Sequence, residues 1–119
     1  MANGKIKTFK FNDDGEEFEC CVAIDNENNI FMYSVDEDGC WEDFADVTMN
    51  PGPGAFVPPG YVVINHNLGK DARDALIVLG IIDQPEPVFS IRCANVIADV
   101  CKFNPEKAKE WNAYDVLFA

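Results

Sequence analysis

The sequence predicts an α+β fold of one domain over residues 1–119. We expect a mostly antiparallel sheet that opens with an N-terminal meander, one packed helix and a short C-terminal helix. Short strand-like segments alternate with Asp, Asn and Gly turns through the first half, and one clear amphipathic helix follows them. The chain is 48% hydrophobic, which provides enough apolar side chains for a core at this length.

The first half is expected to form four strands joined by tight turns. The strand-like segments are residues 5–11, 17–24, 30–35 and 41–49. The sequences NDDG, DNENN and DEDG between them carry the Asp, Asn and Gly residues that tight turns favour. Because side chains alternate between the two faces of a strand, one face is buried. The residues expected on it include Val22, Ile24, Phe31 and Tyr33.

The middle of the chain is expected to be a rigid loop, a short strand and a helix. Residues 50–60, NPGPGAFVPPG, are too rich in Pro and Gly for a helix or a strand. An apolar strand at 61–65 follows. The next segment predicts a helix at 70–79, with Asn67 as its N-cap and Gly80 as its stop signal.

The C-terminal part is expected to complete the sheet and to end in a short helix. Residues 88–93 and 95–103 favour one or two further strands. Asn104 followed by Pro105 is a typical N-cap and first-turn pair, which predicts a short helix to about Asn112.

Charge is the most unusual property of the chain. The formal net charge is −12 at pH 7, and it is unevenly distributed. Residues 11–69 hold thirteen Asp and Glu and no Lys or Arg, whereas the remainder holds nine basic and eight acidic residues. A surface of one sign repels nucleic acid and anionic membranes, and it attracts basic protein surfaces or cations. We therefore expect no direct contact with nucleic acid or membrane.

We expect a cytoplasmic protein of bacterial type. The N-terminal lysines are not followed by the apolar segment of a signal peptide, and no run approaches the ~20 apolar residues that span a bilayer. The five cysteines are an odd number, which favours reduced thiols over a disulfide framework.

No motif for a metal, a cofactor or catalysis is complete, and we expect none of the three. In the turn that begins at Asp36, Cys40 and Trp41 stand where an EF-hand needs an oxygen ligand and a glycine. NPGPG lacks the lysine and the helix of a phosphate-binding loop. His66 is the only histidine and belongs to no recognisable catalytic motif. A weak calcium site in the acidic turns stays open.

The leading functional hypothesis is a non-enzymatic module that docks a basic protein surface. The stretch VDEDGCWEDFADV, residues 35–47, holds six acids beside Trp41 and Phe44. Aromatic side chains of this kind often serve as apolar anchors at binding interfaces. Alternate strand residues lie roughly 6.6–6.8 Å apart, a spacing comparable to successive phosphates, so such acids could mimic a nucleic acid. The pairs that could have this spacing are Glu17 with Glu19 and, if the strand extends that far, Asp36 with Asp38. The expected contacts are Asp36, Glu37, Asp38, Trp41, Glu42, Asp43 and Asp46.

Four stretches resemble one protein family. They are NIFMYSVDEDG (29–39), FADVTMN (44–50), PPGYVVINHN (58–67) and ALIVLGII (75–82). Their order is similar to that in domain-of-unknown-function family 4313, small proteins of gut bacteria and their mobile elements. The resemblance covers nearly two-thirds of the chain, and the cysteine-rich segment 88–103 departs from it. It implies a mobile-element setting, in which small acidic proteins often inhibit host defence systems, and it implies no site residues.

Two other classes of function stay open. A small enzyme or metal-dependent protein could use His66 with cysteine or carboxylate partners, which must lie within hydrogen-bond reach or one bridging water. A structural or accessory subunit could self-associate through an apolar patch around Phe56 and Val57.

Overall fold

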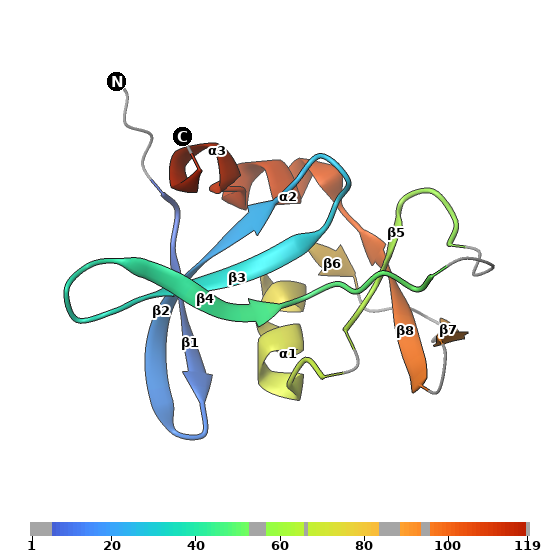
Figure 1. Cartoon of the computed structure of the whole chain (residues 1–119), viewed down its shortest axis with the longest axis horizontal. Helices are drawn as coiled ribbons and strands as arrows, with labels where there is room; N and C mark the ends of the chain where they lie inside the picture. The colour runs from blue at the N-terminus through green and yellow to red at the C-terminus, as the bar shows by residue number, and fades with distance from the viewer. Residues whose placement is uncertain (1–5, 53–56, 66, 84–88, 94–95, 119) are drawn as a thin grey trace.

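The first sheet is a four-stranded antiparallel meander in the order β1-β2-β3-β4 (Figure 1). The computed structural model describes residues 6–52, 57–65, 67–83, 89–93 and 96–118. The strands of this sheet are β1 (Phe9–Asp13), β2 (Glu16–Ile24), β3 (Ile30–Val35) and β4 (Trp41–Asp46). The predicted N-terminal meander is therefore confirmed, with β1 shifted toward the following turn and β4 ending before Val47.

The turns that flank β3 are built alike, each around one aspartate. Asp25 Oδ1 accepts hydrogen bonds from the backbone N–H groups of Glu27 and Asn29, both at 2.9 Å. Asp36 Oδ1 does the same for the N–H groups two and four residues later, also at 2.9 Å. The fourth residue of each turn has a left-handed backbone, with φ of 65° at Asn28 and 82° at Gly39. Asn and Gly are the residues that adopt this conformation at least cost.

The second sheet is centred on β8, which pairs antiparallel with β5, β6 and β7. Its strands are β5 (Tyr61–Val63), β6 (Ile82–Asp83), β7 (Phe89–Cys93) and β8 (Val96–Phe103). Hydrogen bonds from Met49 N to Val63 O at 3.0 Å and from Asn65 N to Val47 O at 2.8 Å tie β5 to the chain that leaves β4. The two-residue β6 was not anticipated from the sequence, because Ile81 and Ile82 directly continue the apolar pattern of the preceding helix.

Three helices complete the α+β fold over the described residues: α1 (Lys70–Leu79), α2 (Pro105–Trp111) and α3 (Tyr114–Leu117). Gly80 ends α1 with φ 82°, as expected of a helix stop. The predicted N-cap of α1 was wrong, since Gly69 occupies that position and the backbone N–H of Asn67 instead donates to Asn65 Oδ1. Asn104 caps α2 as predicted by accepting from two N–H groups of the first turn. The short α3 was not predicted.

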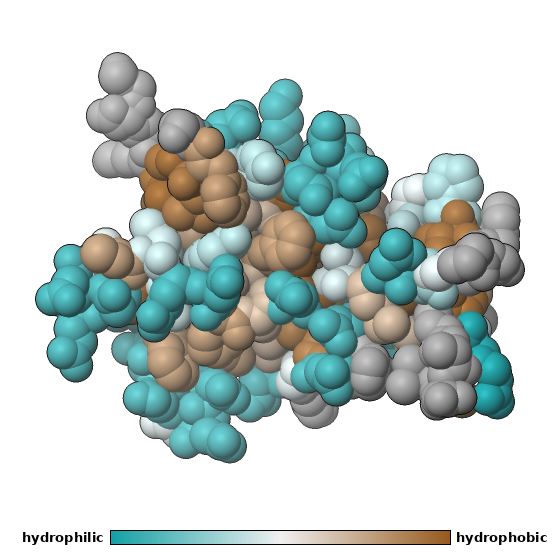
Figure 2. All heavy atoms as spheres, viewed as in Figure 1, coloured by the Kyte–Doolittle hydropathy of each residue, from teal (hydrophilic) through white to brown (hydrophobic). Residues whose placement is uncertain are grey.

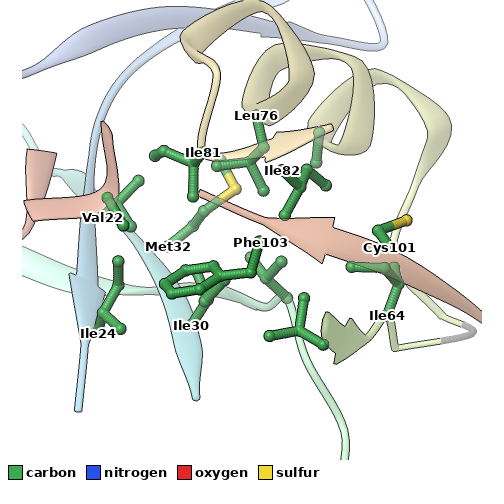
Figure 3. Packing of buried hydrophobic residues seen from close by; sticks show 14 of the residues in the cluster. Val22, Ile24, Ile30, Met32, Ile64, Leu76, Ile81, Ile82, Cys101 and Phe103 are labelled. Atoms are coloured by element: carbon green, nitrogen blue, oxygen red, sulfur yellow. The ribbon is translucent and has the colours of Figure 1, made fainter. Parts of the chain in front are cut away.

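The main hydrophobic cluster draws side chains from both sheets and from α1 and α2. Figure 3 shows Val22 and Met32 of the first sheet gathered with Leu76 of α1 and Phe103 of β8. Within β3 the buried residues are Ile30, Met32 and Ser34, at 0%, 1% and 4% exposure. The expectation that Phe31 and Tyr33 would lie on the buried face was therefore wrong. The register pairs Met32 with Val22 and thereby places both on the core face.

The C-terminal segment closes the opposite face of the first sheet. Asn112 bonds to the backbone of Ile24 in both directions, with its Oδ1 accepting at 2.8 Å and its Nδ2 donating at 3.0 Å. Beyond it, the Phe118 ring meets the Tyr33 ring edge-on, with 5.9 Å between ring centroids. The contact between α3 and β2 leaves Cys21 and Ala23 fully buried on this face.

Candidate functional site

The two N-terminal hairpins separate where the pairing of β2 with β3 ends. That register begins at Cys20 opposite Ser34, so residues 16–19 of β2 pair only with β1. In Figure 1 the β1–β2 turn points down while the β3–β4 turn points to the left. A groove of about 520 Å³ lies between them, and we call it the hairpin groove. The carboxylates that line it are Glu16, Glu17, Asp36, Glu37, Asp38 and Glu42.

The hairpin groove also exposes strand backbone. On the β1 side of β2, Val22 O accepts from Ala113 N at 2.8 Å, and Ile24 bonds to Asn112. Backbone groups alternate between the two edges of a strand, so those of odd-numbered residues in β2 point toward β3. The N–H and C=O of Glu17 therefore point into the groove, where the β2–β3 register provides no partner residue. The groove thus combines carboxylates with a free stretch of sheet edge.

The acidic span of the sequence lies on the first sheet and its turns. Of the thirteen acids between residues 11 and 69, all except Asp25 and Asp36 are exposed, and those two are half-buried. Figure 2 shows hydrophilic side chains at the ends of both hairpins. Lys10 of β1 approaches Glu17 at 3.8 Å, but both side chains are well exposed, so this pair neutralises little of the field.

Four of the seven expected contact residues lie together at the hairpin groove. Glu37 and Asp38 are exposed at the tip of the β3–β4 turn, and Glu42 is exposed on the strand that follows. Asp36 lines the groove as well, but its Oδ1 holds the turn through two backbone N–H groups. Asp36 and Asp38 thus belong to a turn rather than to one strand face, which removes their predicted phosphate-like spacing. The sequence reasoning missed Glu16, whose part depends on the separation of the hairpins.

The other three expected residues lie elsewhere. Trp41 pairs with Val35, and Asp43 pairs with Tyr33, which places both on the face of β4 opposite to Glu42. Burial and then the neighbouring Asp43 carboxylate, which also accepts a hydrogen bond, raise the pKa of Tyr33. Asp46 lines a separate pocket beside α1. A single flat partner surface therefore cannot contact all seven residues at once.

Phe44 is partly buried and packs against the core, apart from the hairpin groove. Its ring centroid lies 5.4 Å from that of Phe11 and 5.1 Å from that of Phe18. A register shift between Met32 and Tyr33, opposite this part of β4, changes the alternation of the strand. The ring therefore contributes to packing, and its predicted part as an apolar anchor beside Trp41 stays a prediction.

The buried cysteines are poor candidates for nucleophiles or metal ligands. Burial first, and then a neighbouring charge, raise the pKa of Cys20 to about 11 and that of Cys21 to about 12. Burial also raises the pKa of Cys101, against the opposing effect of Arg73. A thiol with a raised pKa stays protonated near neutral pH, whereas both roles require the thiolate. In the part of the chain that the structure describes, no three His, Cys, Asp or Glu residues are grouped to hold a metal ion.

Two residues of the alternative hypotheses lie outside the described ranges. These are His66 and Phe56. Val57, the other residue of the expected apolar patch, is half-buried and packs against the small cluster of Val63, Ala98 and Val100.

Comparison with known proteins finds no relative of this chain. None of the described helices is long and apolar enough to cross a membrane. The resemblance to family 4313 stays a prediction. No family model, no curated protein and no solved structure matches the chain.

Proposed function

We propose that this protein is a non-enzymatic binding module whose hairpin groove docks a basic surface of another protein. The observation that carries the proposal is the gathering of six carboxylates around one groove, with no basic residue among the described residues that line it. Charges of one sign in a concave site reinforce each other and raise the rate of encounter with a cationic partner. The volume of the groove, about 520 Å³, is also large enough to admit side chains of that partner.

The free edge of β2 adds a second element of recognition. The backbone of Glu17 faces the groove, so an extended segment of the partner can pair with it as an added strand. Lysine or arginine side chains of that segment would then meet the carboxylates of both hairpins. The gathered carboxylates, and not the strand pairing, would let the protein occupy the nucleic-acid site of such a partner. An inhibitor from a bacterial mobile element that acts in the cytoplasm is part of this proposal.

Affinity capture from a bacterial lysate at low and high salt tests this function. The decisive variant is Glu37→Gln/Asp38→Asn/Glu42→Gln, which removes three exposed groove carboxylates and changes the net charge from −12 to −9. We expect the wild-type protein to retain a nucleic-acid-handling protein that salt releases, because screening weakens contacts between exposed charges. The variant should lose that partner.

A matched control separates the groove from net charge alone. The variant Asp83→Asn/Glu106→Gln/Asp115→Asn also has a net charge of −9, and its three exposed side chains lie outside the first sheet. It should capture the same partner as the wild type. Equal loss in both variants would mean that non-specific charge drives the capture. A complex that salt does not release, or one of the protein with itself, would contradict the proposal and favour the self-associating subunit.

A further inference from the structure

A second pocket lies between the first sheet and the N-terminal end of α1. Its volume is about 510 Å³, and it shares no residue with the hairpin groove. Apolar side chains from three parts of the chain form its inner wall, namely Phe11 of β1, Phe44 of β4, and Leu68 and Ala72 at the start of α1. The rings of Phe11 and Phe44 meet edge-on at 5.4 Å, which gives the wall a rigid aromatic surface.

The rim of this pocket is negative on three sides. Asp13 lies at the end of β1, Asp46 at the end of β4 and Asp71 in the first turn of α1. Among the side chains that the structure describes, no lysine or arginine lines the pocket. The N-terminus of α1 contributes only about half a positive charge, which cannot offset three carboxylates. The described charges therefore favour a cation over an anion.

The pocket does not have the geometry of a metal site. Among the described residues no three carboxylate, thiol or imidazole side chains are grouped closely enough to hold an ion. A bare divalent cation also gains nothing from a wall of phenylalanine rings, since it binds through oxygen ligands. A ligand that matches both parts of the pocket must carry an apolar portion and a diffuse positive charge.

We propose that this pocket binds a small organic cation, a guanidinium or primary ammonium group on an alkyl stem. The stem packs against Phe11, Phe44 and Leu68, where it leaves water. The charged group lies among the exposed carboxylates of Asp13, Asp46 and Asp71. The amide side chains of Asn65 and Asn67 also line the pocket and add polar groups for the N–H donors of such a ligand.

Titration of the full-length protein with n-butylguanidinium tests the inference, with backbone amide shifts of Ala45, Gly69 and Ala72 as the readout. Two compounds serve as controls. Neutral n-butylurea has the same shape without the charge, and unsubstituted guanidinium has the charge without the stem. We expect butylguanidinium to bind about tenfold more tightly than either, and its affinity to fall as salt rises. Equal binding of butylurea, or no shift at these amides with butylguanidinium, would overturn the proposal.

Two variants of equal charge locate the site. Asp13→Asn/Asp46→Asn removes two rim carboxylates, whereas Glu37→Gln/Asp38→Asn removes two in the hairpin groove; each changes the net charge from −12 to −10. Asp13→Asn/Asp46→Asn should lose most of the preference for butylguanidinium over butylurea. Glu37→Gln/Asp38→Asn should keep that preference. The reverse result would place the cation in the hairpin groove and refute this site. Loss of partner capture alone would instead concern only the proposed docking function.

Discussion

The side chains of Asp25 and Asp36 each organise a turn by accepting two backbone hydrogen bonds. Part of the acidity in this half of the chain therefore serves the fold, because these two carboxylates hold their turns together. Asp25 accepts a third hydrogen bond, from Asn29 Nδ2 at 3.0 Å. Exposed acids such as Glu37 and Asp38 hold no comparable contact in the structure, which is why they are better candidates for docking.

The turn around Asp25 makes stability depend on pH in the acidic range. Burial would raise the pKa of Asp25, but hydrogen bonds from Asn29 and from the N–H of Glu27 outweigh it and lower the pKa. Stability from this carboxylate is thus present above its unfolded pKa of 3.8 and is lost as pH falls through the lower folded value. In urea unfolding, Asp25→Asn should be less stable than wild type at neutral pH and equal to it near the acid limit. A difference that grows on acidification would contradict this.

Turn chemistry could be predicted from the sequence, whereas the buried face of β3 could not. The signals at Asp25 and Asp36 are local, since the aspartate and its N–H partners lie within four residues. Residues 30–35, IFMYSV, are apolar at both parities, so alternation alone could not choose between Ile30 and Phe31. The choice follows from contacts distant in sequence, with α1 on one face and α3 on the other.

At the scale of elements, one polar network fastens α1 to the second sheet. Arg73 of α1 donates to the Asp99 carboxylate of β8, and its other nitrogen donates to Cys101 Sγ at 3.5 Å. Ser90 of β7 completes the network with a 2.9 Å bond to Asp99. The hydrogen bond from Arg73 is the largest influence that lowers the pKa of Asp99. Because both side chains of the pair are half-buried, each depends on the other for its hydrogen bonds.

A double-mutant cycle on this pair tests its part in stability. Arg73→Met and Asp99→Asn should each lower the free energy of unfolding by about 1–2 kcal/mol, the usual cost of leaving such a partner unsatisfied. The double variant should lose clearly less than the sum, by roughly 1 kcal/mol, since one interaction is removed twice. Urea unfolding at neutral pH provides the four values. Additive losses would show that the two side chains act independently.

At the scale of the whole molecule, much of the negative charge is concentrated on the first sheet and its turns. The sequence predicted this concentration along the chain, but it did not predict how the acids are arranged in space. The thirteen acids of the base-free span all lie between Asp13 and Asp46, within the first sheet and its turns, so the acidic half of the chain became an acidic part of the fold. The division of the expected contacts among the hairpin groove, the opposite face of β4 and the pocket beside α1 was beyond sequence reasoning. It depends on the register between strands and on where β2 and β3 part.

Crowded carboxylates should lower stability, and this cost can be measured. Raising NaCl from about 0.02 M to about 0.5 M should increase the free energy of unfolding by on the order of 1 kcal/mol, because screening weakens like-charge repulsion. Glu37→Gln/Asp38→Asn/Glu42→Gln should be more stable than wild type at low salt and less sensitive to salt. The control Asp83→Asn/Glu106→Gln/Asp115→Asn, with the same net charge, should gain less, since its carboxylates are not gathered at one groove. Such a gain is expected where a binding surface is kept at the expense of stability. A groove variant less stable than wild type at low salt would instead make these acids part of what holds the hairpins.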